Sequence, residues 1–133
     1  MAVTPEQLAK SGTEHGHQAA LMCWCAQSGI PESKWLFAIP NGFYATPAQK
    51  AKMKAEGLRS GVSDILLPVT KRHYIDDQKI ITCGLFIEMK SVKGKISYEQ
   101  AEFGRFVTSQ GYQFVVCYSW IEARDEILRY LGK

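Results

Sequence analysis

Apolar residues recur at helical spacing in four parts of the chain, and each part begins at a Ser or Thr that can cap a helix. This pattern predicts helices over residues 14–28, 46–57, 97–110 and from 119 onward. Ser97 and Ser119 are each followed by Gln or Glu three residues later, the spacing of a capping box. The last helix is expected to bury one stripe of side chains: Trp120, Ala123, Ile127 and Leu131.

Short apolar runs between these helices predict strands over residues 35–39, 62–69, 80–90 and 112–118. The polar segment 71–79 is expected to be a hairpin or an exposed loop, and Pro40-Asn41-Gly42 a turn. The elements then follow the order α, β, α, β, β, α, β, α. This order indicates an α/β (mixed α+β) fold, a central mixed four-stranded sheet flanked by helices. The last two strands should run parallel, because a helix connects them.

Size and composition favour one domain over residues 1–133, with 46% hydrophobic and 22% charged residues. No apolar run reaches the length of a membrane span, and the first residues lack a signal peptide's apolar region. We therefore expect a cytoplasmic protein, phage-encoded or bacterial, with no membrane partner and no organic cofactor. The four cysteines include no C-x-x-C pair, so buried thiols are expected rather than a zinc site.

Charged residues stand inside two of the predicted strands. Asp64 opens the strand 62–69, and Glu88 and Lys90 lie two residues apart near the end of 80–90, which places both on one face. Buried charges are costly unless they are paired or bind a metal. Two carboxylates beside a lysine suit Mg²⁺, which binds phosphate oxygens and activates water. These are the components that phosphodiester hydrolysis needs.

Each of these residues also has a structural alternative. Glu88 and Lys90 could be a surface pair, and Asp64 a residue of a strand-start turn. Glu14 could favour a helix N-terminus through the dipole, and Gln100 could be only the second half of a capping box. The three histidines are expected at the surface rather than in a site.

The pattern Asp64…Glu88-Met89-Lys90 resembles the PD-(D/E)XK nuclease superfamily. Its surroundings resemble the virus-type replication-repair nuclease (VRR-NUC) domain over about residues 14–118, in the motifs Glu14-x-x-x-Gln18, Asn41-Gly42, Gly57-x-x-x-Gly61-Val62-x-Asp64, Ile87-Glu88-x-Lys90, Ser97-x-x-Gln100 and Gly111. One departure is Ser63, which stands before the acid where the superfamily has Pro.

The resemblance implies a restriction-endonuclease-like core and a role for each matched residue. Asp64, Glu88 and the Met89 backbone carbonyl would bind Mg²⁺ or Mn²⁺, and Lys90 would be the catalytic lysine. Glu14 would hold the metal directly or through water. Gln100 would support Lys90 or a phosphate.

The resemblance also implies a structure-specific DNA endonuclease, similar to Holliday-junction resolvases and working on branched DNA as a homodimer. The alternatives are a catalytically silent DNA-binding or scaffold protein, and a nuclease for flaps or plain duplex. The net charge of +3 is compatible with nucleic acid without requiring it. Candidate DNA contacts, which could equally be solvated surface residues, are Asn41, Lys50, Lys52, Lys54, Arg59 and Lys93.

Overall fold

The central sheet of the computed structural model, which describes residues 2–40 and 45–133, has four strands in the order β1-β2-β5-β6. They are β1 (Phe37–Ala38), β2 (Ile65–Leu67), β5 (Leu85–Met89) and β6 (Gln113–Cys117). The pairs β1–β2 and β2–β5 are antiparallel, and β5–β6 is parallel. The prediction of a mixed four-stranded sheet is therefore confirmed, including the parallel pairing of the two strands that a helix connects in the chain.

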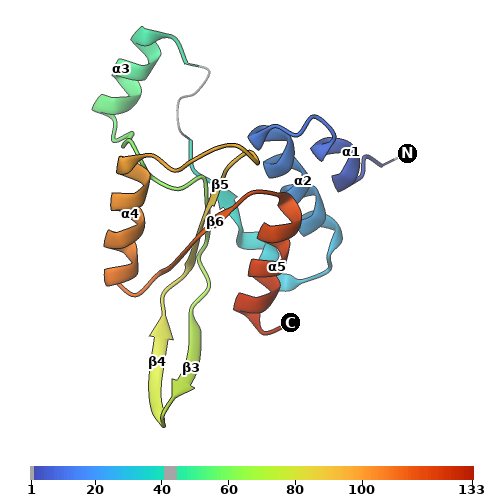
Figure 1. Cartoon of the computed structure of the whole chain (residues 1–133), viewed down its shortest axis with the longest axis vertical. Helices are drawn as coiled ribbons and strands as arrows, with labels where there is room; N and C mark the ends of the chain where they lie inside the picture. Colours follow the sequence, from blue (N-terminus) through green and yellow to red (C-terminus); the bar gives the residue numbers. More distant parts are fainter. Residues whose placement is uncertain (1, 41–44) are drawn as a thin grey trace.

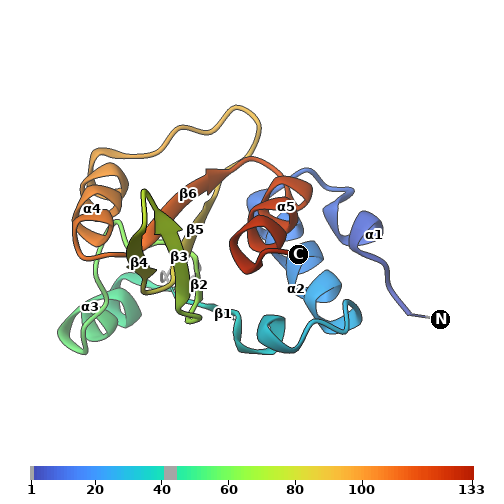
Figure 2. The same ribbon diagram turned by 90° about the horizontal axis from the view of Figure 1, so that it is seen from below.

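Helices cover both faces of this sheet (Figures 1 and 2). On one side lies α4 (Tyr98–Ser109), with α3 (Pro47–Ala55) near it. On the other side lie α2 (Glu14–Gln27) and α5 (Trp120–Leu131). The Ser or Thr before each of these four helices accepts a backbone hydrogen bond from the helix's first turn, as predicted. At α5 the return bond is shifted, because Glu122 accepts from the N–H of Tyr118 rather than from that of the cap.

Two N-terminal features differ from the prediction. A five-residue helix, α1 (Pro5–Ala9), precedes α2 and packs on it. It is too short to give a helical repeat in the sequence. The predicted strand 35–39 is shorter than expected, because Trp35 ends a 3₁₀ helix, Pro31–Trp35, and only Phe37 and Ala38 form β1. The turn predicted at Pro40-Asn41-Gly42 falls partly on residues 41–44, which lie outside the described residues.

The predicted strand 80–90 is wrong as a single element. Its first part belongs to a hairpin of β3 (Lys71–Ile75) and β4 (Gln78–Thr82), which projects from one end of the sheet (Figure 1). Asp76 and Asp77 both have positive φ, as a two-residue type I′ turn requires. A break at Cys83 and Gly84 separates β4 from β5. The apolar run continues through this break, so hydrophobicity alone does not reveal it.

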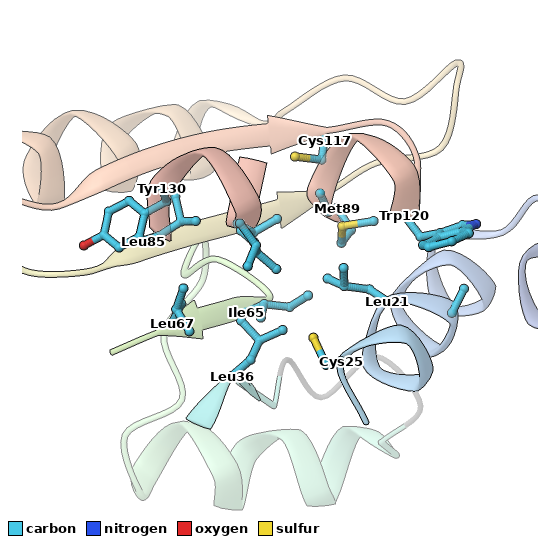
Figure 3. Close-up of a cluster of buried hydrophobic side chains, with 14 residues drawn as sticks. Leu21, Cys25, Leu36, Ile65, Leu67, Leu85, Met89, Cys117, Trp120 and Tyr130 are labelled. Atoms are coloured by element: carbon cyan, nitrogen blue, oxygen red, sulfur yellow. The ribbon is translucent and has the colours of Figure 1, made fainter. Parts of the chain in front are cut away.

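The main core lies between the sheet and the helices α2 and α5 (Figure 3). Leu21 and Cys25 of α2 point toward Ile65 and Met89 of the sheet. In α5 the buried side chains are Trp120, Ala123, Ile127 and Tyr130, so Tyr130 takes the place predicted for the half-buried Leu131.

The four cysteines are free thiols. Cys25 and Cys117 are buried as predicted, whereas Cys83 is exposed and Cys23 half-buried, which the prediction missed. No helix among the described residues has the length and apolar character needed to cross a membrane.

Candidate active site

The pairing of β2 with β5 brings two carboxylates together. Ile65 pairs with Ile87, so Asp64, one residue before β2, stands opposite Glu88 on the same face of the sheet. The Asp64 Oδ2 atom accepts a hydrogen bond from the Met89 N–H at 2.8 Å. Asp64 is thus fixed by the strand that carries Glu88, as the sequence predicted if the strands were neighbours.

Glu88 is almost completely buried, with 2% of its surface exposed. Its Oε1 accepts a hydrogen bond from Gln100 Nε2 at 2.7 Å and lies 3.8 Å from Lys90 Nζ. Its Oε2 atom is buried and has no hydrogen-bond partner among the described residues. A surface ion pair, the structural alternative for Glu88 and Lys90, is excluded because the glutamate is in the interior.

Burial makes both carboxyls reluctant to ionise. Burial raises the pKa of Glu88 to about 8, and the neighbouring Asp64 charge adds to this effect, while Lys90 opposes it. The pKa of Asp64 is also raised, chiefly by burial, although the Met89 N–H stabilises its charge. A single lysine therefore does not compensate for two buried carboxylates.

This arrangement fits a divalent cation. Glu88 offers a buried oxygen for which residues 2–40 and 45–133 provide no hydrogen-bond partner, and Asp64 offers a second carboxylate directly opposite. Within the described part of the chain, no three His, Cys, Asp or Glu side chains form a complete metal-binding group. Two carboxylates suit Mg²⁺ nevertheless, because that ion usually keeps several waters. The Met89 carbonyl as a third ligand stays a prediction.

Lys90 lies directly beyond the end of β5, where its backbone N–H continues the ladder by donating to the Cys117 carbonyl at 2.9 Å. Its side chain is 13% exposed. The two-residue spacing puts it on the face of Glu88, as predicted. The mostly buried ammonium group of Lys90 thus lies on the same face of the sheet as the two carboxylates.

Glu14 stands in the first turn of α2 and contacts the segment after Lys90. Its Oε1 accepts a hydrogen bond from the Ser91 N–H at 3.3 Å. Its charge also raises the pKa of both Asp64 and Glu88, which places it near them. Glu14 therefore ties α2 to the site, while its proposed role toward the metal stays a prediction.

Gln100 combines the two roles that the sequence left as alternatives. Its Oε1 accepts from the Ser97 N–H, which completes a capping box, and its Nε2 donates to Glu88. The side-chain contact is with Glu88, and the support of Lys90 or of a phosphate stays a prediction. The cap thereby orients the amide that holds one oxygen of the buried carboxylate.

The predicted DNA contacts lie in different places. Lys50, Lys52 and Lys54 are exposed on α3, and Arg59 follows it. A hollow of about 220 Å³ is lined by Lys50, Lys54, Leu58, Arg59 and Ser60 but not by Lys52. Lys93 is exposed in a turn after Lys90, and Asn41 is outside the described residues.

Sequence reasoning missed two features around the site. His17 is half-buried rather than at the surface, and its Nδ1 accepts the Trp120 N–H at 3.0 Å, which links α2 to α5. Ser63, at the position where the superfamily has Pro, is fully buried and its Oγ has no partner among the described residues. Neither feature gives a local sequence signal, because the His17 contact depends on a partner distant in the chain and the burial of Ser63 depends on how the elements pack.

Comparison with known proteins agrees with this geometry. The model of the VRR-NUC domain family matches residues 12–120. A solved structure described as a VRR_NUC domain protein has a TM-score of 0.68 and 19% identity, covering 99% of this chain and 91% of that chain. At this identity, the match shows the shared fold. Comparison with curated proteins gives no match.

Proposed function

The chain belongs to the VRR-NUC family, whose members are nuclease domains of the PD-(D/E)XK type that act on DNA, and we propose that it is a Mg²⁺- or Mn²⁺-dependent endonuclease for branched DNA. The observation that carries this proposal is the Oε2 atom of Glu88, which is buried beside Asp64 and Lys90 and has no hydrogen-bond partner in the described part of the chain. A silent scaffold protein would gain nothing from keeping such a costly cluster.

Asp64 and Glu88 would hold the cation through facing carboxylate oxygens. The bound cation would supply two things, a water of lowered pKa and positive charge at the phosphate oxygens. Lys90, 3.8 Å from Glu88 Oε1, would donate a hydrogen bond to the attacking water or to the phosphate and would neutralise charge as the bond to phosphorus forms. Gln100 donates to the same Oε1 atom, which leaves Oε2, without a hydrogen-bond partner among the described residues, for the cation.

Four-way junctions are the proposed substrate, and a homodimer the proposed working form. A junction presents two symmetry-related strands, and a two-fold dimer presents two identical sites to them. The exposed cations that line the hollow, Lys50, Lys54 and Arg59, would contact the DNA backbone.

The experiment that tests catalysis compares cleavage of a labelled four-way junction and a matched linear duplex in Mg²⁺, Mn²⁺ or EDTA. We expect cleavage with either metal and none in EDTA. Asp64→Asn and Lys90→Ala should each lose at least a hundredfold in rate, whereas Lys95→Ala, which removes an exposed lysine nearby, should retain it. Equal cutting of duplex would overturn only the junction preference. DNA binding without cleavage under every metal would instead support the scaffold.

Contact with α3 is tested separately through salt dependence. We expect Lys50→Ala, Lys54→Ala and Arg59→Ala each to weaken DNA binding and to lower the slope of log affinity against log salt by roughly one. Lys52→Ala is the matched control, since that residue is on the same helix but does not line the hollow. If Lys52→Ala has the same effect, the helix binds DNA as a diffuse charged surface instead.

A further inference from the structure

The strand β6 ends the sheet on the side away from β1, and its outer edge faces no other strand in the part of the chain described (Figure 2). The Gln113 N–H donates to Gly84, and the Cys117 carbonyl accepts from Lys90. Residues 113, 115 and 117 therefore direct their backbone groups toward β5. By alternation, Phe114 and Val116 direct theirs outward.

Hydrogen bonds within the chain occupy both ends of this edge. The Tyr112 N–H donates to the Val107 carbonyl, and the Tyr118 N–H donates to Glu122. Between them, Phe114 and Val116 offer two N–H and two C=O groups to any strand that arrives. Natural proteins usually protect such an edge with charged residues or proline, yet β6 contains neither.

A groove runs beside the edge, under α4. It has a volume of about 400 Å³, and its lining residues are Ile96, Ala101, Gly104, Arg105, Thr108 and Phe114. The helix α4 straddles β5 and β6, since Phe103 packs edge-on against Phe86 of β5 and Gly104 lies against Phe114 of β6. The groove is thus the flank of α4 that faces past the edge of the sheet.

We propose that a second copy of this chain binds here, with β6 pairing antiparallel to the partner's β6 across a two-fold axis at Val115. Phe114 would then face Val116 of the partner subunit, and the outward backbone groups of both would be satisfied. This register is self-complementary, because it sets apolar residues against apolar residues. The proposed interface rests on the proposed function, which calls for a homodimer, and it specifies the surface through which that dimer forms.

The same register determines the separation of the two sites. In this register the strands lie side by side in the order β5, β6, the partner's β6 and the partner's β5, so the two copies of β5 are three strand spacings apart. Glu88 pairs with Val116, which is one residue along the strand from the two-fold axis. The Cα atoms of the two Glu88 residues would therefore be about 16 Å apart, from a strand spacing of ~4.8 Å and a rise of ~3.3 Å per residue. Both would face the α4 side of one continuous eight-stranded sheet, so two cuts could fall on one junction.

Helix packing permits this arrangement. A helix above the gap between β5 and β6 lies about 10 Å from its symmetry mate, which is the usual distance between packed helices. The two copies of α4 would meet along the groove, where Ala101 and Gly104 provide little side-chain bulk.

The test measures molecular mass by light scattering at micromolar concentration. We expect a dimer for the native chain and a monomer for Val116→Pro, because proline removes an outward N–H that donates to no group among the described residues. Thr108→Arg, which fills the groove without altering β6, should also give a monomer. Phe106→Arg, an exposed position on the opposite flank of α4, should stay dimeric. Circular dichroism establishes that each variant is folded.

A covalent test gives a positive result. Val115→Cys should form a disulfide with its own copy under mild oxidation, since facing residues of such a pair have Cα atoms about 4.5 Å apart. The native chain, with the same four other cysteines, is the control. A native chain that is monomeric would overturn the proposal. So would a folded Val116→Pro variant that remains dimeric, together with a Val115→Cys variant that forms no disulfide. The molecular mass measured by light scattering does not depend on DNA cleavage. A dimer that cleaves no DNA would therefore refute only the proposed nuclease function and not the proposed interface.

Discussion

Glu88 shows how a single residue can be costly for the fold and useful for the chemistry. Its pKa is raised to about 8 in the folded chain from an ordinary value of 4.5. Without metal, the folded state therefore holds a proton that the unfolded chain releases. The stability from this protonation is complete below about pH 4.5 and is lost as the pH rises toward 8.

Glu88→Gln is therefore expected to separate stability from activity. In EDTA the native chain should unfold at a lower temperature at pH 8 than at pH 5, while the neutral Gln removes most of this decline. At pH 8 the variant should be the more stable protein, although it loses cleavage. Thermal unfolding followed by circular dichroism measures both chains, with the exposed Glu102→Gln as control. Identical pH slopes for native and Glu88→Gln would contradict the assignment.

Gln100 is expected to affect the site more than the helix it caps. Gln100→Ala removes both the capping bond and the hydrogen bond to Glu88, whereas Ser97→Ala removes its own half of the cap and leaves Glu88 untouched. Each variant should lose about 1 kcal/mol of stability. Only Gln100→Ala should lower cleavage at limiting Mg²⁺, by tenfold or more. Equal rates for the two variants would reduce Gln100 to a cap.

At the scale of elements, the sequence predicts where a local signal exists. The four capped helices, the mixed four-stranded sheet and the parallel pairing of its last two strands follow from capping residues, apolar periods and the helix that connects those strands. The hairpin boundary at Cys83 does not, since apolar residues continue on both sides of it. The opposition of Asp64 and Glu88 requires the register of β2 and β5, which no local pattern specifies.

The loop between α3 and β2 depends on one glycine. Gly61 has φ +86°, and a Cβ atom added there would lie 2.5 Å from the Glu99 carbonyl oxygen of α4. Gly61→Ala should therefore displace the loop that carries Asp64, at a cost of roughly 2 kcal/mol or more, and reduce cleavage. Gly57→Ala is the matched control, because its φ is also positive but no atom of the described residues lies within 4 Å of its added Cβ. A urea titration compares the two, and equal losses would show that the contact with Glu99 has no effect.

At the scale of the whole molecule, the candidate site joins elements from every layer. Glu14 comes from α2, Asp64 and Glu88 from neighbouring strands, and Gln100 from α4. The sequence singled out all four residues, yet it did not predict the hydrogen bonds from Gln100 to Glu88 and from Ser91 to Glu14. Those contacts depend on how the layers pack, and packing is decided by side chains from the entire core.

Because the site spans the layers, metal binding should stabilise the whole fold. A cation that binds only the folded state at a hundredfold its Kd adds about 2.7 kcal/mol to the free energy of unfolding. We expect Mg²⁺ to raise the melting temperature of the native chain, and more at pH 8 than at pH 5, because protons compete for Glu88 at the lower pH. Asp64→Asn should abolish the increase, whereas Asp77→Asn, in the distant hairpin turn, should keep it. A native melting temperature that Mg²⁺ and Mn²⁺ leave unchanged at pH 8 would mean that the two facing carboxylates do not bind a divalent cation, and the catalytic proposal would fail with them.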